Sequence, residues 1–392
     1  MKSQFTLLST CLLVAMTAVA AAQVQKHPMF DRWDKNSDGR LTRDELPAGA
    51  RQNFDRADTD DDGFISPAED LAIRARFRQD QRPARPATAR PATDRPAANR
   101  PVPPRFNDAI TVKHDLFYAD NENRAQSLDV YLPARRVSDR PLPLLVWIHG
   151  GGWRGGDKRG GGQITHLVTS GRYVGASINY RLSGEATWPA QIHDCKAAIR
   201  WLRANAAKYG IDPTRIAVLG GSAGGHLVAA VGTMGDVAAL EGKVGSHTDQ
   251  SSAVTCVVDF YGPTDLLQMS RFPSTIDHDA ASSPESLLVG GPIQERKETV
   301  RQVNPITHLS KGDPPILIAH GTEDKLVPFN QSELLYAAMK KQNLDVTLIT
   351  MKGGGHGGWS SNERLRAIIS LFLEKHLYGK DAEIADETIV VR

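Results

Sequence analysis

Three residues in the second half of the chain have the types and the order of a nucleophile, an acid and a base. Ser222 lies in Gly-Gly-Ser-Ala-Gly, between the apolar run RIAVLG and the helical stretch GHLVAAVGTM, which is the strand–turn–helix context of the G-x-S-x-G pattern. Asp324 follows the run PPILIAH, and His356 lies in a glycine-rich loop after the run DVTLIT. A serine whose proton passes to a histidine that an aspartate orients is the arrangement of nucleophilic acyl transfer.

A second glycine-rich segment, HGGGW at 149–153, follows the apolar run PLLVWI. Glycines allow backbone N–H groups to approach a carbonyl oxygen, which an oxyanion hole requires. A phosphate-binding loop is the rival interpretation, but the patterns G-K-[ST] and G-x-G-x-x-G are missing from this segment. We expect His149 to orient the loop by hydrogen bonding, and we assign no task to His193, His226 or His320.

Short apolar runs alternate with helical stretches from about residue 106 to residue 380. The predicted strands are PLLVWIH, YVGASIN, RIAVLG, AVTCVVDFYG, PPILIAH and DVTLIT. Continuous apolar strands separated by helices predict a parallel sheet covered on both faces, so the fold class is α/β. The three reactive residues then follow the carboxyl ends of strands, where open α/β sheets bind ligands. Residues 263–311, rich in Ser, Asp and Pro, are expected to form a partial cap over the serine.

Residues 106–380 resemble the esterase branch of the α/β-hydrolases, the HGGG-bearing group that includes bacterial acetyl esterases and acetylxylan or feruloyl esterases. The resemblance covers nearly the whole segment, and its motifs are HGGGW (149–153), NYRLSGEATWPAQIHDCKAAIRWLR (179–203), GGSAGGH (220–226), HGTEDKLVP (320–328) and GGGHGGW (353–359). It implies ester hydrolysis and an α/β-hydrolase fold, with a mostly parallel sheet flanked by helices.

The same resemblance implies a role for each reactive residue. Ser222 is the nucleophile, and His356 is the base that later returns a proton to the leaving alcohol. Asp324 is the acid that fixes the imidazole tautomer, in preference to the adjacent Glu323. The tetrahedral oxyanion is held by the backbone amides of Gly151, Gly152 and Ala223. No cofactor is implied for catalysis.

An acidic segment, residues 23–78, contains a repeat: FDRWDKNSDGRLTRDE at 30–45 is followed by FDRADTDDDGFISPAE at 54–69. Both copies fit the calcium-loop pattern, whose 12-residue spacing wraps hard oxygen ligands around one ion. The expected ligands are the side chains of Asp34, Asn36, Asp38 and Glu45 in the first loop and of Asp58, Asp60, Asp62 and Glu69 in the second, together with the backbone carbonyls of Arg40 and Phe64.

This segment resembles an EF-hand pair, which implies bound Ca²⁺; a dockerin-like pair built on similar loops is the alternative. A second alternative is that Thr42 to Glu45 and Ser66 to Glu69 are only helix capping boxes, but two tandem matches favour calcium. We expect Leu41 and Ile65 to pair across the loops. Because extracellular calcium modules often bind weakly and calcium is plentiful there, we expect a structural or docking role, remote from the catalytic centre.

The remaining segments have compositions of their own. Residues 1–22 contain a short apolar stretch before a small-residue cleavage site, which predicts a removable signal peptide and leaves no stable membrane span in the mature chain. Residues 79–105 are rich in Pro, Arg and Ala and predict an extended linker. Residues 381–392 are expected to be a C-terminal tail. Cys195 and Cys256 are expected to be buried free thiols.

Charge and composition narrow the function. The formal net charge of +2 in 392 residues gives no excess of basic residues for nucleic-acid binding. We expect a secreted or periplasmic serine carboxylic-ester hydrolase with a calcium-binding accessory module. Its expected substrates are short acyl, acetyl-type esters, including those of acetylated or feruloylated polysaccharides, because residues 263–311 do not resemble the broad apolar lid that long acyl chains require. The alternatives are a serine peptidase of the prolyl oligopeptidase kind and a calcium-dependent binding protein with an inactive hydrolase domain.

Overall fold

The computed structural model describes residues 28–46, 54–58, 63–67, 69–70 and 109–391. The chain divides into two units, residues 1–100 and residues 101–392. The predicted signal peptide and the predicted linker lie outside the described residues. In the described part of the chain, no helix is both long and apolar enough to cross a membrane.

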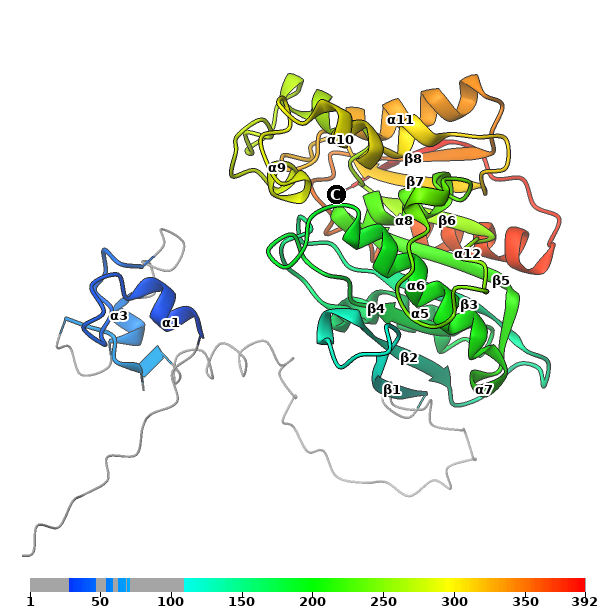
Figure 1. The fold of residues 1–392 in the computed structure, drawn as a ribbon, viewed down its shortest axis with the longest axis horizontal. Helices are drawn as coiled ribbons and strands as arrows, with labels where there is room; N and C mark the ends of the chain where they lie inside the picture. Colours follow the sequence, from blue (N-terminus) through cyan, green and yellow to red (C-terminus); the bar gives the residue numbers. More distant parts are fainter. Residues whose placement is uncertain (1–27, 47–53, 59–62, 68, 71–108, 392) are drawn as a thin grey trace, which may run out of the picture. The chain divides into compact units, whose positions relative to one another are not determined.

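A nine-stranded sheet, all of it within the described residues, is the centre of the larger unit (Figure 1). Its strand order is β1-β2-β4-β3-β5-β6-β7-β8-β9. The pairs β1–β2 and β2–β4 are antiparallel, and every other pair is parallel, as the fold class predicts. The strands are β1 (Ile110–Phe117), β2 (Ser127–Pro133), β3 (Leu142–Ile148), β4 (Val174–Ile178), β5 (Ile211–Gly221), β6 (Cys256–Phe260), β7 (Ile316–Gly321), β8 (Val346–Lys352) and β9 (Glu387–Val390).

The strands that the apolar runs predict are β3 to β8, and the structure adds three at the edges. β1 and β2 extend one edge, and β9 pairs with β8 at the other. Part of the expected C-terminal tail, Glu387–Val390, therefore forms β9. Only Ile389 of β9 is buried, so this short edge strand has no apolar run to mark it in the sequence.

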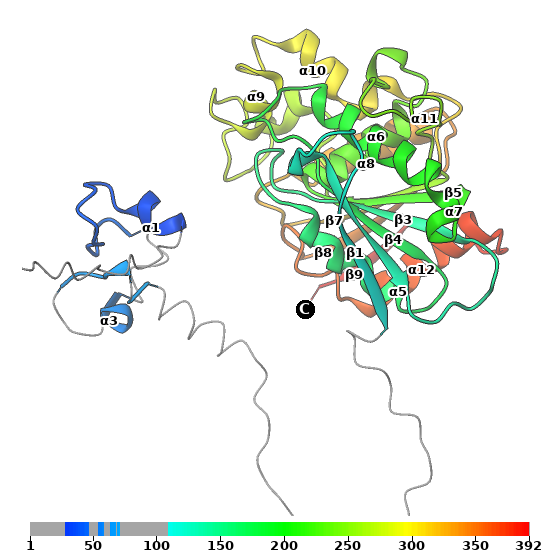
Figure 2. The same ribbon diagram turned by 60° about the horizontal axis from the view of Figure 1, so that its bottom comes forward.

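Helices cover both faces of the sheet (Figure 2). Successive side chains of a strand point to opposite faces. Val146 and Val218 therefore lie in the core beneath α6, α8 and α11, while Leu145 and Leu219 lie in the core beneath α5 and α12. The helices of this unit are α5 (Gly162–Val168), α6 (Ala190–Ala204), α7 (Ala206–Tyr209), α8 (Ala223–Thr233), α9 (Pro284–Val289), α10 (Lys297–Val303), α11 (Asn330–Lys341) and α12 (Glu363–Tyr378).

The two cysteines of the larger unit are buried and unpaired, as predicted. Cys195 on α6 belongs to the core on one face of the sheet, and Cys256 at the start of β6 belongs to the core on the other face. The sheet therefore separates them, and burial raises the pKa of both thiols.

The smaller unit is built around the two acidic loops. Leu41 and Ile65 pair across the loops, as predicted, through backbone hydrogen bonds of 3.0 and 2.9 Å. The described helices of this unit are α1 (Pro28–Trp33) and α3 (Phe54–Ala57). They contribute Phe30 and Phe54 to a small core that contains the Leu41–Ile65 pair. Two paired loops with a shared apolar core agree with what the resemblance to an EF-hand pair implies.

Candidate active site

Ser222 lies on the sharp turn that joins β5 to α8. Its φ of 58° and ψ of −125° are outside the regions that non-glycine residues commonly adopt. Its backbone amide donates a hydrogen bond of 2.9 Å to the carbonyl of Phe260. A Cβ atom at Gly220 would lie 2.5 Å from the carbonyl oxygen of Gly224. The strand and the helix therefore cross so closely that only glycine fits, and the strained serine is held at the carboxyl edge of the sheet.

Asp324 and His356 come together from the loops after β7 and β8. The Nδ1 atom of His356 lies 2.7 Å from Oδ2 of Asp324. The aspartate side chain is fully buried, whereas the histidine is 21% exposed and lines the same pocket as Ser222. Burial raises the pKa of Asp324, but hydrogen bonds with His320 and His356 outweigh it and hold this pKa well below its usual range. The ionised carboxylate favours the proton on Nδ1, which leaves Nε2 of His356 free to accept one.

His320, to which the sequence analysis gave no task, is a third partner of this carboxylate. Its Nε2 lies 3.2 Å from Oδ2 of Asp324 and 3.0 Å from the carbonyl of Val327, and its Nδ1 lies 2.7 Å from Oγ of Ser332. Because both partners of Nε2 are acceptors, Nε2 carries the proton and the serine hydroxyl donates to Nδ1. The other carboxylate oxygen accepts the amides of Leu326 and Val327 at 2.8 and 2.9 Å. Four donors therefore fix the aspartate.

The predicted oxyanion loop lies against the serine turn. Gly151 and Gly152 have φ angles of 118° and 59°, which favour glycine. A Cβ atom at Gly150 would lie 2.5 Å from the carbonyl oxygen of Gly221, so the loop passes this turn with no room for a side chain. Ala223 is the first residue of α8, and an amide at this position has no acceptor one turn earlier in its own helix. All of these residues border one pocket.

Two buried histidines hold the oxyanion loop. Nδ1 of His149 lies 2.8 Å from the carbonyl of Gly150, so this ring orients the loop as expected. His226 on α8 links the loop to α10: its Nδ1 accepts from Nε1 of Trp153 at 3.2 Å, and its Nε2 donates to the carbonyl of Val303 at 2.9 Å. Burial lowers the pKa of His226 to about 4, so this bridge is neutral at pH 7. A helical histidine gives no sequence signal for such a contact.

The pocket above these residues has a volume of about 560 Å³. Ser222, His356 and the glycines of the oxyanion loop lie in its walls. The segment expected to form a cap supplies one wall through Pro263, Ile276, His278, Pro284 and Glu285. One cavity is therefore bordered by a nucleophile, by a base that a buried carboxylate orients, and by amides able to hold an oxyanion. These are the groups that acyl transfer requires.

The calcium-loop residues that the structure describes are arranged around sharp glycine turns. Gly39 and Gly63 have φ angles of 82° and 84°. Oδ2 of Asp34 accepts the amide of Gly39 at 2.9 Å, and Oδ2 of Asp58 accepts the amide of Gly63 at 3.0 Å. Glu45 accepts both the amide and the hydroxyl of Thr42 at 2.8 Å. The capping contact and the calcium-loop turn are therefore both present.

The chemistry of these loops fits a hard cation, since every predicted ligand atom is an oxygen. Asp60 and Asp62 lie outside the described residues. Among the residues that are described, no three His, Cys, Asp or Glu side chains gather closely enough to hold a metal ion.

Comparison with known proteins places both units. Residues 128–339 match the family named BD-FAE, and residues 26–47 and 51–69 match the EF hand. The Esterase LipC of Mycobacterium tuberculosis is 32% identical over 70% of this chain and 67% of its own length. Across the first curated relatives that it matches, the chain spans about half to two thirds of their length.

Solved structures agree with this placement. A truncated carbohydrate esterase from gut microbiota is 35% identical, with a TM-score of 0.64 over 69% of this chain and 98% of that chain. An acetyl ester-xyloside bifunctional hydrolase from Caldicellulosiruptor lactoaceticus is 25% identical, with a TM-score of 0.53 over 66% of this chain and 94% of that chain.

Proposed function

Because the chain belongs to the BD-FAE family of α/β-hydrolase esterases, we propose that it is a secreted serine carboxylic-ester hydrolase that removes short acyl groups from polysaccharide esters. The observation that carries this proposal is the 2.7 Å contact of His356 with the buried Asp324, in a pocket that Ser222 shares. In the same proposal, an EF-hand pair binds calcium as a structural or docking module.

The mechanism follows from these positions. Nε2 of His356 takes the hydroxyl proton of Ser222 as the serine oxygen attacks the ester carbonyl, and Asp324 stabilises the imidazolium that forms. The amides of Gly151, Gly152 and Ala223 receive the negative charge of the tetrahedral oxygen. His356 then gives the proton to the leaving alcohol, and water, activated by the same imidazole, releases the acyl group from the serine.

Two features support the substrate class. The wall contributed by residues 263–311 includes the buried pair His278 and Glu285, whose Nδ1 and Oε1 atoms lie 3.0 Å apart, so this side of the pocket is not an apolar slot for a long acyl chain. The second feature is the similarity to the carbohydrate esterase from gut microbiota, which extends over 98% of that esterase. Polysaccharides must be attacked outside the cell, which accords with the expected signal peptide and a secreted or periplasmic location.

The calcium proposal gives the smaller unit a role outside the chemistry. Its oxygen ligands would come from the Asp34–Glu45 and Asp58–Glu69 loops, including the described side chains of Asp34, Asn36 and Asp38. An ion in each loop would stiffen that loop by holding its oxygen ligands around one centre.

Hydrolysis of p-nitrophenyl acetate and of acetylated xylan by the purified mature protein tests the proposal, with Ser222→Ala as its partner variant. We expect turnover of both esters by the wild type and loss of at least 10³-fold in the variant, since removal of a triad serine costs on the order of 10⁶ in kcat and the oxyanion hole alone retains part of the catalysis. Equal turnover by the variant would refute the nucleophile. Cleavage of a dipeptide p-nitroanilide in place of the esters would favour the peptidase.

A further inference from the structure

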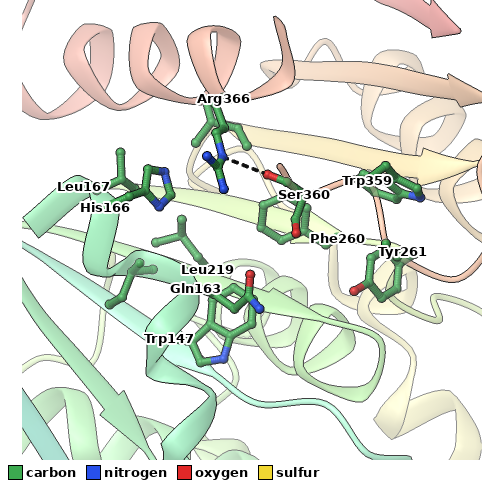
Figure 3. Close-up of a pocket in the computed structure, with 14 residues that line it drawn as sticks. Trp147, Gln163, His166, Leu167, Leu219, Phe260, Tyr261, Trp359, Ser360 and Arg366 are labelled. Atoms are coloured by element: carbon green, nitrogen blue, oxygen red, sulfur yellow. Dashed lines mark hydrogen bonds between the residues drawn. The ribbon is translucent and has the colours of Figure 1, made fainter. Parts of the chain in front are cut away.

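A second cavity, of about 170 Å³, opens between α5 and α12 on the face of the sheet opposite α8 (Figure 3). We call it the α5/α12 cavity. Trp147 and Tyr261 line both this cavity and the catalytic pocket. Gly357, which directly follows the base His356, also lines it. The two hollows are therefore neighbours that share the side chains of Trp147 and Tyr261 as walls.

The floor of the α5/α12 cavity is aromatic. Trp147 from β3 and Phe260 from β6 have ring centroids 6.2 Å apart, and Trp359 packs on Phe260 and Tyr261 at 6.5 and 5.5 Å. Trp147, Phe260 and Tyr261 are only half-buried, so part of each ring is exposed. Aromatic rings offer large apolar faces at a small conformational cost, and exposed clusters of this kind mark binding sites.

The rim of the cavity is polar and comes from the two helices. Figure 3 shows Gln163 and His166 from α5 and Arg366 from α12 among the residues that line the cavity, and all three are exposed. Nε of Arg366 donates to the carbonyl of Ser360 at 3.1 Å, which fixes the guanidinium at this rim. Burial, and next the charge of Arg366, lower the pKa of His166, so its ring is a neutral hydrogen-bonding group. An aromatic floor with several donors at the rim suits a sugar ring, which has an apolar C–H face and hydroxyls at its edge.

We propose that the α5/α12 cavity binds a sugar ring of the alcohol part of the substrate, next to the sugar that carries the ester. This inference rests on the proposed ester hydrolysis of polysaccharides. The side of the substrate follows from the mechanism: His356 must protonate the oxygen of the leaving alcohol, so the alcohol lies beside His356. Gly357 and Tyr261, which border the cavity, lie on that side of the serine, and the ring of Tyr261 is 4.6 Å from that of His356.

Tyr261 is the junction between the two hollows. Its φ of 47° is unusual for a residue with a large side chain, and such strain collects at functional sites. A Cβ atom at Gly357 would lie 2.9 Å from the Tyr261 hydroxyl oxygen, and one at Gly221 would lie 3.0 Å from it. Glycines on both sides therefore let the tyrosine lie between the nucleophile turn and the base loop, where a substrate passing from one hollow to the other would contact it.

The test uses the double variant Gln163→Ala/Arg366→Ala, since both side chains are exposed and their loss leaves the core intact. Arg364→Ala, also exposed on α12 but paired with Glu387 on β9, is the matched control. We expect the double variant to lower kcat/KM for acetylated xylotetraose about tenfold more than for p-nitrophenyl acetate. A tenfold effect corresponds to the loss of about two hydrogen bonds to the sugar. The control should lower both equally or not at all.

Binding measured without turnover separates this inference from the proposed function. Calorimetric titration of unesterified xylotetraose into the Ser222→Ala protein should give an affinity that falls about tenfold when the two rim substitutions are added. Binding that is absent, or unchanged by the rim substitutions, overturns the sugar site even if p-nitrophenyl acetate is hydrolysed. A selective loss on esters with a bulky aromatic acyl group would also overturn it, because the cavity would then hold the acyl side.

Discussion

Replacement of Asp324 by asparagine tests the triad, because an asparagine cannot satisfy all the hydrogen-bond donors that surround this side chain. Oδ1 accepts the backbone amides of Leu326 and Val327, and Oδ2 faces the ring nitrogens of His320 and His356. An asparagine has one oxygen and one NH₂ group for these two positions. If the NH₂ faced the two amides, donors would meet donors, at a cost of about 1–3 kcal/mol for each unsatisfied group.

The NH₂ of Asp324→Asn must therefore turn towards the two histidines. Nδ1 of His356 then has to accept a hydrogen bond, so its proton moves to Nε2, the atom that should take the proton of Ser222. We expect kcat for p-nitrophenyl acetate to fall about 10⁴-fold, or about 5 kcal/mol of transition-state stabilisation. KM should change little, because the aspartate is buried beneath the pocket wall and does not contact the ester.

Stopped-assay kinetics with Glu323→Gln as the control decide the outcome. Glu323 is the adjacent acid and is exposed, so its replacement should keep kcat within about twofold of the wild type, as surface changes usually do. If kcat of Asp324→Asn stayed within tenfold of the wild-type kcat, and circular dichroism showed an intact fold, the tautomer assigned to His356 would be refuted. A larger loss in the Glu323 variant would reassign the acid.

Three further predictions concern the oxyanion loop, His226 and the calcium loops. Gly150→Ala should lower kcat at least tenfold in the p-nitrophenyl acetate assay, because its Cβ would lie 2.5 Å from the carbonyl oxygen of Gly221, whereas Gly184→Ala, with nothing within 4 Å of the added atom, should not; equal effects would contradict the close approach. Between pH 6.5 and pH 4, the free energy of unfolding measured in urea should fall by about 3 kcal/mol more in the wild type than in His226→Gln. The reason is that the unfolded histidine takes up a proton below its ordinary pKa of 6.5, whereas the buried one does so only near its pKa of about 4. Equal pH dependence in the two proteins would contradict this. Chelation of calcium with EGTA should leave the rate of p-nitrophenyl acetate hydrolysis within about twofold of the untreated enzyme. Calcium binding measured by titration should be weakened by Asp34→Ala, as expected for a loop ligand. Loss of hydrolysis on chelation, with the hydrolase unit still folded, would place calcium in the catalytic chemistry.

The sequence by itself determined the features that short-range patterns encode. Runs of buried aliphatic residues fixed β3 to β8, because a parallel strand covered on both faces has no polar alternation. The glycines around Ser222 and in the HGGG segment marked tight turns, since a side chain would clash there. The repeated acidic spacing marked the two loops, down to the Leu41–Ile65 pair that the structure contains.

Only the tertiary structure decided which groups meet. His320 and His226 look alike in the sequence, yet one fixes the carboxylate of the triad and the other ties the oxyanion loop to α10. The edge strand β9 and the α5/α12 cavity were equally invisible, because pairing with a neighbour and the convergence of two helices depend on residues far apart in the chain. The physical reason is that sequence spacing places a residue on a helix, strand or loop, but only tertiary packing determines which groups its side chain contacts.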